Sequence, residues 1–292
     1  MQDVNKNIQI GLSIGNSRYH WAWFLDTKFQ SSWDTEYLTI DRYSQLFPID
    51  LQAIIKTDRL NLNLIPIYLI SVVSNQTAIW QQLPQVKQII LADIPLLNMY
   101  PTLGIDRALA AFGAGEIYGY PVLVIDGGTA LTITGIDQNQ CLVGGAILPG
   151  LRLQIRSLST GTAALPSVEL PRQLPPRWSD NTAGSISSGI LHTVSAGISD
   201  FIKDWYQLYP QSQIVFTGGD GVALINYLQA DLSSKVIPRN KYTLGFGFGS
   251  AQPPRVERSR NPFAWYSFYR ESPKVKLDRD LLFHGLSAII SS

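Results

Sequence analysis

Two widely separated stretches of this sequence share one local pattern, in which a strand-like apolar run leads into a glycine turn and then into a second such run. Ile8–Ile14 and Tyr19–Phe24 flank a Gly-Asn-Ser turn, whereas Pro121–Asp126 and Ala130–Ile136 flank a Gly-Gly-Thr turn. Neither turn is followed at once by a helical pattern. This argues against a Rossmann or Walker-type phosphate loop, because those loops open directly into a helix. The repeated pattern predicts two related halves that each begin with a β-hairpin.

The remaining elements alternate between strand and helix. Continuous apolar runs predict buried strands at Ile65–Val73 and Ile214–Phe216. The spacing of apolar residues predicts helices at Asp106–Tyr118 and within Asn181–Leu208. The proline-rich segment Leu165–Trp178 is typical of an irregular loop. This alternation predicts the α/β class.

Composition narrows the class of protein. The 292-residue chain is 45% apolar and 15% charged, as expected of a well-packed globular protein, and its net charge of +1 gives no electrostatic reason to expect nucleic acid as a partner. The single cysteine, Cys141, excludes an internal disulfide. No apolar run approaches the roughly 20 residues of a membrane-spanning helix, and the N-terminus lacks a signal-peptide pattern. We therefore expect a cytoplasmic protein that binds neither membrane nor nucleic acid.

Two kinds of chemistry find no support in the sequence. The three histidines, His20, His192 and His284, have no metal-ligand spacing, so no zinc site is predicted. The single G-x-S-x-G match, Gly11–Gly15, leads into a second strand-like run instead of a helix, so it does not predict the nucleophile elbow of a Ser-His-Asp hydrolase.

The character of the sequence changes from about Ala251 onward, where prolines, basic residues and clustered aromatics occur together. We expect residues 251–292 to form a C-terminal extension outside the core. An appended tail without chemistry is the simpler interpretation, because chain ends seldom carry a fold.

An acidic residue ends the strand before the second glycine turn. In Asp126-Gly127-Gly128-Thr129 the carboxylate lies at the C-terminal end of a buried strand, where open α/β sheets bind ligands. The glycines let backbone N–H groups approach an anion, and Thr129 adds a hydroxyl. Asp126 can then bind a cation that accompanies a phosphate. The alternative is a plain hairpin in which Asp-Gly forms a type I′ turn.

Adjacent opposite charges occur in Gly104-Ile105-Asp106-Arg107. Asp106 can accept a proton from a substrate hydroxyl, and Arg107 can clamp a carboxylate through two hydrogen bonds. The alternative is that Asp106 only caps the helix that follows.

Three further segments have both a functional and a structural interpretation. Gly144–Gly150 predicts a small-residue turn that a ligand or a strand can approach closely. Thr217–Gly221 can pass beneath a nucleotide or simply join a strand to a helix. Asn181-Thr182 together with Ser185–Gly189 can cap a helix or line a pocket.

Taken together, these motifs resemble one family. Their order is G-N-S, P-x-x-G-x-D-R, D-G-G-T, G-G-A-I-x-P-G, T-A-x-L-P, N-T-x-x-S-I and T-G-G-D, spread over roughly residues 8–250. Each motif is weak alone, but seven in this order resemble the type III pantothenate kinases of the actin-like, sugar kinase and Hsp70 group. The resemblance implies duplicated RNase H-like domains, here residues 1–118 and 119–250, with the active site in the cleft between them. It also implies phosphorylation of pantothenate by ATP, dependence on Mg²⁺ and on a monovalent cation (K⁺ or NH₄⁺), and a homodimer.

The resemblance also assigns residues. Asp106 is the implied catalytic base, and Asp126 is the implied residue beside the monovalent cation. The implied pantothenate-binding residues are Tyr100, Gly104, Ile105, Asp106, Arg107 and Thr182. The implied ATP-binding residues are Ser13, Ile14, Gly15, Asn16, Ser17, Arg18, Tyr19, His20 and Thr129.

The chain departs from the family pattern at one position. The first loop of the family reads Asp-x-Gly-Asn-Thr, and its aspartate helps to hold the metal and phosphate, whereas this chain has Ser13. Ser17 in place of threonine keeps the hydroxyl. Three hypotheses follow: an active pantothenate kinase, a catalytically impaired member that binds or regulates, and a kinase for a different small alcohol.

Overall fold

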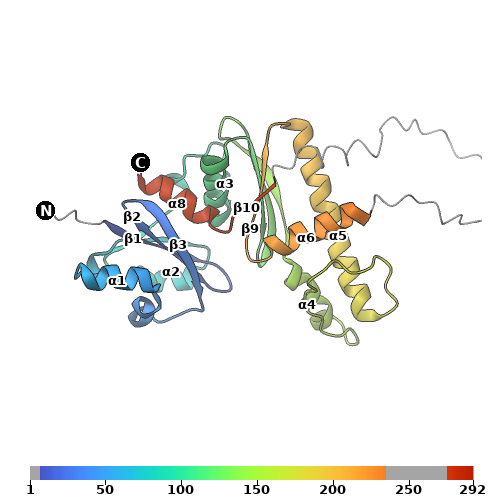
Figure 1. Cartoon of the computed structure of the whole chain (residues 1–292), viewed down its shortest axis with the longest axis horizontal. Helices are drawn as coiled ribbons and strands as arrows, with labels where there is room; N and C mark the ends of the chain where they lie inside the picture. Colours follow the sequence, from blue (N-terminus) through green and yellow to red (C-terminus); the bar gives the residue numbers. More distant parts are fainter. Residues whose placement is uncertain (1–6, 235–274, 292) are drawn as a thin grey trace, which may run out of the picture.

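The computed structural model describes residues 7–234 and 275–291, which form two five-stranded sheets with their helices (Figure 1). The predicted α/β class is confirmed. Among the helices in these two ranges, none combines the length and the hydropathy needed to cross a membrane.

The first sheet grows from the predicted N-terminal hairpin. β1 (Ile8–Ile14) pairs antiparallel with β2 (Tyr19–Leu25), and β2 pairs antiparallel with β3 (Lys28–Thr35). On its other side β1 pairs in parallel with β4 (Ile67–Ser71), which pairs in parallel with β5 (Val86–Gln88). The strand order is therefore β3-β2-β1-β4-β5.

The second sheet repeats this topology. β6 (Val122–Gly127) pairs antiparallel with β7 (Ala130–Ile136), and β7 pairs antiparallel with β8 (Leu142–Pro149). β6 also pairs in parallel with β9 (Gln213–Thr217), and β9 pairs in parallel with β10 (Val275–Leu277). Read outward from β6, each neighbour and direction matches the first sheet read outward from β1. Both predicted hairpins are confirmed, and they occupy equivalent places in their sheets.

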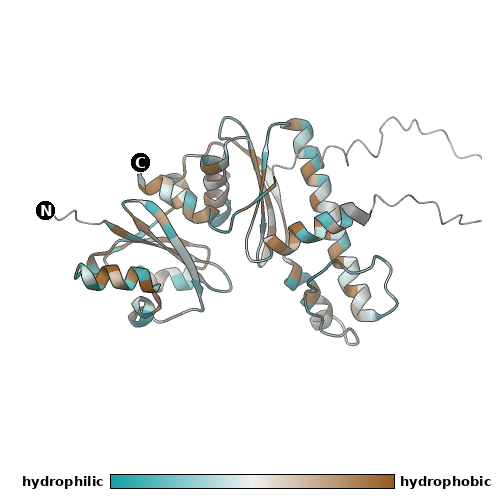
Figure 2. Cartoon of the chain, viewed as in Figure 1, coloured by the Kyte–Doolittle hydropathy of each residue, from teal (hydrophilic) through white to brown (hydrophobic). Residues whose placement is uncertain are grey.

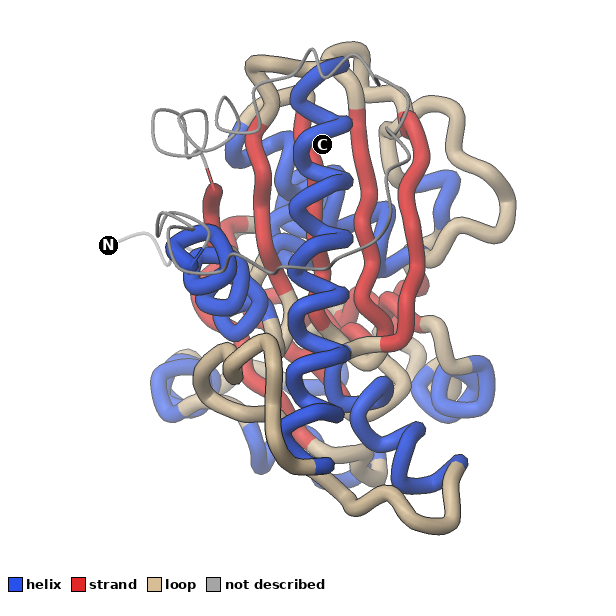
Figure 3. Tube along the Cα trace, turned by 90° about the vertical axis from the view of Figure 1, so that its right-hand side faces the viewer, coloured by secondary structure: helices blue, strands red, loops and turns tan. Residues whose placement is uncertain are grey.

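Helices connect and cover the strands. The described α-helices are α1 (Ile49–Thr57), α2 (Ser74–Trp80), α3 (Ile105–Tyr118), α4 (Leu151–Gly161), α5 (Thr182–Leu208), α6 (Gly221–Ser234) and α8 (Leu281–Ser291). Short 3₁₀ segments lie at η1 (Ile40–Leu46), η2 (Leu62–Leu64) and η3 (Leu91–Asp93). The long helix α5 crosses the face of the second sheet (Figure 3). Gly135 in β7 permits this packing, because a Cβ there would stand 2.4 Å from the Trp205 ring.

Within residues 7–234 and 275–291, the buried apolar side chains form three clusters. One lies in the first half around β1, β2 and β4, and another lies between the second sheet and helices α5 and α6. The helices carry both apolar and polar residues, as their mixed colouring shows (Figure 2). This mixture is expected of helices that cover a sheet and face water on the other side.

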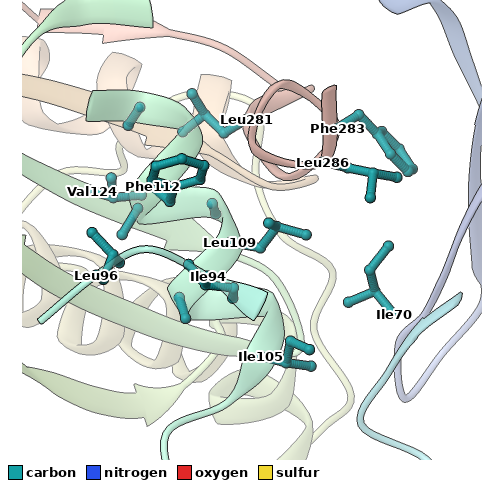
Figure 4. Packing of buried hydrophobic residues seen from close by; sticks show 14 of the residues in the cluster. Ile70, Ile94, Leu96, Ile105, Leu109, Phe112, Val124, Leu281, Phe283 and Leu286 are labelled. Carbon is teal, nitrogen blue, oxygen red and sulfur yellow. The ribbon is translucent and has the colours of Figure 1, made fainter. Parts of the chain in front are cut away.

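The third cluster joins the two halves around α3 (Figure 4). Leu109 and Phe112 of this helix belong to one buried cluster with Ile70 of the first sheet, Val124 of the second, and Leu286 of α8. Because this helix is enclosed on several sides, the residues at its N-terminus are held in a fixed place relative to both sheets.

The expectation that residues 251–292 lie outside the core is wrong for residues 275–291. β10 completes the second sheet, and α8 packs on α3 so closely that a Cβ at Gly113 would stand 2.1 Å from the carbonyl oxygen of Leu281. The Tyr118 hydroxyl donates to Asp278 at 2.9 Å. Short apolar runs after a polar, proline-rich stretch gave no periodicity long enough to predict this return to the core. Residues 251–274 lie outside the described residues.

One smaller expectation, and the structural alternative given for Asp106, are also wrong. Gly144–Gly150 is largely strand, since β8 runs to Pro149, and the turn follows it. Asp106 is not the N-cap of its helix, because Gly104 occupies that position. By contrast, the capping interpretation of Asn181 is confirmed, since its side chain accepts a hydrogen bond from the Gly184 backbone N–H at the start of α5 at 2.8 Å.

Candidate active site

The two predicted glycine turns meet in the structure. Ser17 Oγ and Thr129 Oγ1 lie 2.9 Å apart, although 112 residues separate them in sequence. The Gly15 N–H closes the first turn by donating to the Arg18 carbonyl at 3.2 Å, and the Tyr37 hydroxyl donates to the Gly15 carbonyl at 2.5 Å. Ser17 and Thr129 are both exposed. The two halves therefore present one shared, accessible edge made of glycine backbone and hydroxyl groups.

Asp126 lies at this edge, near the end of β6. Gly218 is required beside it, because this glycine has a φ of +79° and a Cβ there would stand 2.2 Å from Asp126 Oδ1. The Asp220 N–H donates to the Gly127 carbonyl at 2.8 Å, which holds the T-G-G-D turn against the end of β6. The Thr217–Gly221 segment thus joins β9 to α6 and also forms one wall around Asp126.

The charge of Asp126 is strongly influenced by its surroundings. Burial and, to a lesser extent, the nearby negative charge of Asp106 raise the pKa of Asp126, His20 and Arg107 lower it, and the net pKa is about 6. The two carboxylates therefore repel each other across the site, which favours a cation or a shared proton between them. In the part of the chain that the structure describes, no three His, Cys, Asp or Glu side chains cluster as a metal site.

Helix α3 supplies Asp106 from its first turn. Asp106 Oδ1 accepts a hydrogen bond from the Arg107 backbone N–H at 2.8 Å. Gly104 leaves room for this carboxylate, because a Cβ there would stand 2.7 Å from Oδ1. One carboxylate oxygen is thereby fixed, and the side chain is held beside the N-terminus of the helix.

The Arg107 guanidinium is pinned onto β7. Nε and Nη2 donate to Thr134 Oγ1 at 3.2 and 3.1 Å, and Nη2 also donates to the Ile133 carbonyl at 3.3 Å. Nη1 donates to the Tyr100 hydroxyl at 3.1 Å. A guanidinium has five N–H groups, so these contacts leave one Nη1 hydrogen for a ligand. The predicted two-bond clamp from Arg107 alone is therefore not what this geometry offers.

A cross-strand row of polar residues flanks the first turn. Ser13 lies opposite His20, and His20 lies opposite Asp34, on three neighbouring strands. His20 Nδ1 lies 2.7 Å from Asp34 Oδ1, and Arg18 Nη1 lies 3.3 Å from Asp34 Oδ2. The hydrogen bond from His20 is the main cause that lowers the pKa of Asp34, with further lowering from the charges of His20 and Arg18.

Sequence reasoning missed Asp34 and Arg152. Asp34 lies in the unpredicted strand β3, where the placement of Phe29 and Trp33 among polar residues at even spacing was a usable sequence signal. Arg152 Nε lies 3.3 Å from Asp220 Oδ1, which links the start of α4 to the T-G-G-D turn.

Other predicted site residues are placed differently. The side chains of Ile14, Tyr19 and Ile105 are buried in the apolar clusters, so only their backbone groups remain for a ligand. Thr182 is exposed at the first turn of α5. Among the described contacts, none connects Thr182 with Asp106 or Arg107.

The chain is similar in sequence to known proteins of one family. The sequence profile of the type III pantothenate kinases matches residues 10–204. A type III pantothenate kinase of Nostoc sp. is 44% identical over 248 residues, which is 80% of this chain and 90% of the relative. That of Synechocystis sp. is 44% identical over 75% of this chain and 80% of the relative.

Among solved structures, a Campylobacter jejuni protein assigned to the Baf family of transcriptional activators is similar in fold. Its TM-score is 0.53 at 20% identity, and the match covers 96% of both chains. This match concerns the fold alone. The profile and the sequence relatives together establish the identity at family level: the chain belongs to the type III pantothenate kinase family.

Proposed function

We propose that this protein transfers the γ-phosphoryl group of ATP to the primary hydroxyl of pantothenate, which is the first step of coenzyme A biosynthesis. The observation that carries the proposal is the meeting of the two glycine turns, Ser17 against Thr129, beside the paired carboxylates Asp106 and Asp126. Phosphoryl transfer depends mainly on positioning and charge neutralisation. This edge offers both, in a chain that belongs to the kinase family.

The fold assignment extends this proposal. The identical strand order and directions of the two sheets support duplicated RNase H-like halves with the active site in the cleft between them. The first domain is residues 1–118. The second is residues 119–250 together with β10, and α8 returns to pack on α3 of the first.

Asp106 is the catalytic base in this proposal. Its Oδ1 is held by the Arg107 N–H, so Oδ2 is the oxygen available to accept the proton of the substrate hydroxyl. The deprotonating hydroxyl then attacks the γ-phosphorus, and the bond between that phosphorus and the leaving ADP oxygen breaks. Fixing one oxygen limits the rotation of the carboxylate and favours a productive geometry.

Arg107 and Tyr100 together bind the carboxylate of pantothenate. Because the Tyr100 hydroxyl accepts from Arg107 Nη1, its own hydrogen remains to be donated. The remaining Nη1 hydrogen and the Tyr100 hydroxyl then form a pair of donors for one carboxylate. This pair replaces the expected clamp from the guanidinium alone.

Asp126 and Asp106 are the residues that fit a cation. Their mutual repulsion is relieved when positive charge lies near both, and Mg²⁺ is usually held by one or two carboxylates together with substrate phosphates. Mg²⁺ held there would supply positive charge to offset the charge that develops on the transferred phosphoryl group. A monovalent cation (K⁺ or NH₄⁺) belongs beside Asp126 in the same proposal.

The remaining assignments rest on the family resemblance. We place the protein in the cytoplasm as a homodimer, with Thr182 contacting pantothenate. Thr182 is exposed at the start of α5 and therefore accessible to a ligand.

A coupled ADP-release assay with ATP, pantothenate, Mg²⁺ and K⁺ tests the proposal. Turnover that requires pantothenate is the expected result. Pantothenate binding by calorimetry without turnover would instead identify an impaired, binding member of the family. Turnover of another small alcohol, with none of pantothenate, would identify a kinase of different specificity.

A further inference from the structure

The side chain whose role is most similar to that of the family's first-loop aspartate, which this chain lacks, lies on another strand. The family pattern has an aspartate where this chain has Ser13, a buried residue in β1. Two strands away, in the same cross-strand row, is Asp34, with His20 between them. Residues directly opposite on neighbouring strands point to the same face of a sheet. Ser13, His20 and Asp34 therefore share the face at the end of β1 that leads into the first glycine turn.

The contact with Asp34 fixes how His20 faces this turn. A carboxylate only accepts hydrogen bonds, so His20 Nδ1 carries the proton in its 2.7 Å contact with Asp34 Oδ1. The other ring nitrogen, Nε2, is then directed toward the turn, where it can donate to a phosphate in the doubly protonated imidazolium form. A Cβ at Gly15 would lie 3.6 Å from Nε2, which shows how close the ring stands to the turn backbone.

The same carboxylate also holds Arg18. Arg18 Nη1 meets Asp34 Oδ2 at 3.3 Å, so the two oxygens of one side chain hold two different bases. All three side chains are about half exposed, with accessibilities of 43–54%. Exposed ion pairs contribute little to stability. The consequence of this arrangement is therefore the placement of the His20 and Arg18 side chains rather than a large gain in the free energy of unfolding.

This group also reaches the second half of the site. The charge of His20 is felt at Asp126, whose pKa it lowers, so His20 lies within electrostatic range of the other phosphate turn. Because Ser13 stands where the family pattern has an aspartate, the first turn of this chain carries one negative charge fewer than that pattern. The charge of Asp34 is balanced by its two partners, His20 and Arg18. Side-chain donors rather than a carboxylate thus dominate the first turn of this chain.

We infer that Asp34 is a positioning residue that holds His20 and Arg18 against the first glycine turn, so that this turn contacts the phosphates of the nucleotide through those two side chains. The inference rests on the proposed function only in the identity of the nucleotide. It predicts a specific loss of ATP binding when Asp34 is changed, with pantothenate binding retained. It also predicts that S13D does not increase turnover, because a second carboxylate opposite His20 would compete with Asp34.

The main experiment compares D34N and D34E with wild type in the full chain. The KM for ATP and the KM for pantothenate are measured separately, and binding of a non-hydrolysable ATP analogue is measured by calorimetry. D34N is expected to raise the KM for ATP and the Kd for the analogue about tenfold, the scale of a lost charge-assisted contact. The KM for pantothenate should stay within about twofold, and D34E should restore part of the loss.

The matched control is D26N. Asp26 is exposed in the turn at the opposite end of the β2–β3 hairpin, and its φ of 49° suits asparagine as well as aspartate. This variant removes the same charge from the same hairpin and should leave both KM values unchanged.

Three results would overturn the inference: an unchanged KM for ATP in D34N, an equal rise in both KM values with a lower Tm, or a large gain of turnover in S13D. The calorimetry separates this inference from the proposed function. Wild-type protein that binds the analogue but does not turn over pantothenate contradicts the proposed function only, whereas no binding of the analogue contradicts both.

Discussion

The guanidinium of Arg107 donates to the hydroxyl of Tyr100 at 3.1 Å while its other contacts tie it to Thr134 and Ile133 of β7. Arg107 is almost fully buried, whereas Tyr100 is 42% exposed. The exposed hydroxyl is therefore the more accessible member of the pair. The Arg107 side chain, which the sequence predicts to clamp a carboxylate by itself, is instead fixed against β7 and keeps one Nη1 hydrogen beside the Tyr100 hydroxyl.

Tyr100→Phe is expected to weaken the binding of pantothenate. The variant keeps the ring and removes one hydroxyl donor, so we expect about a tenfold rise in the KM for pantothenate and a change of less than about twofold in the KM for ATP. Steady-state kinetics with each substrate varied in turn provides the test. An unchanged KM for pantothenate would remove Tyr100 from the substrate site.

Asp106→Asn is expected to abolish most catalysis while the fold stays intact. Asparagine keeps an oxygen that can accept from the Arg107 N–H, but it cannot accept the proton of the substrate hydroxyl. Loss of a general base costs about 10²–10⁴-fold in kcat. Single-turnover rates measured beside a thermal melt check both parts, and near-normal turnover would argue against Asp106 as the base.

Asp126→Asn is expected to stabilise the protein at neutral pH when cations are absent. Burial raises the pKa of Asp126 from 3.8 to about 6, so ionisation is less favourable in the folded protein than in the unfolded chain. The free energy of unfolding therefore falls as the pH rises from about 4 through about 6, by about 1–3 kcal/mol. Asparagine stays neutral and avoids this loss.

Urea denaturation in EDTA at a series of pH values measures this effect. The variant should exceed wild type in stability at pH 7.5 but not at pH 4, and addition of Mg²⁺ and K⁺ should shrink the difference. A difference that is the same at every pH would show that ionisation of Asp126 is not its cause.

Gly113→Ala is expected to destabilise the contact between α3 and α8. A Cβ at Gly113 would stand 2.1 Å from the Leu281 carbonyl and 2.5 Å from the Gly285 N, both of them backbone atoms that cannot rotate away. We expect a loss of about 2–4 kcal/mol in the free energy of unfolding. Gly197→Ala is the matched control, because this glycine also lies inside a helix but has no neighbour within 4 Å.

Thermal melts of the two variants provide the comparison. Gly197→Ala should be neutral or slightly stabilising, since alanine favours the helix by up to about 1 kcal/mol over glycine. If Gly113→Ala were equally neutral, the close docking of α8 on α3 would be contradicted.

The local features of the fold were predictable from sequence because they depend on neighbouring residues. The strands on either side of both glycine turns, helix α3 and the cap of α5 at Asn181 follow from periodicity and turn chemistry. The return of residues 275–291 to the core was not predictable, because its signal is a long-range fit. Gly285 and Gly113 matter only once their helices are side by side.

The candidate site also combines features that neighbouring residues determine with features that depend on long-range contacts. Asp106, Asp126 and Thr129 were identifiable as chemically capable residues that follow or precede glycines. The meeting of Ser17 with Thr129, the engagement of Arg107 by Thr134, and the row that joins Ser13 to Asp34 all depend on which strands pair. No spacing within one segment can specify such contacts.

The most direct test of the central claim is the rate of ADP release by the full chain with saturating ATP, Mg²⁺ and K⁺, measured with and without pantothenate. An active pantothenate kinase should show turnover that requires pantothenate, yields phosphopantothenate in equal amount with ADP, and is lost in Asp106→Asn. Folded wild-type protein that releases no ADP in response to saturating pantothenate would contradict the central claim.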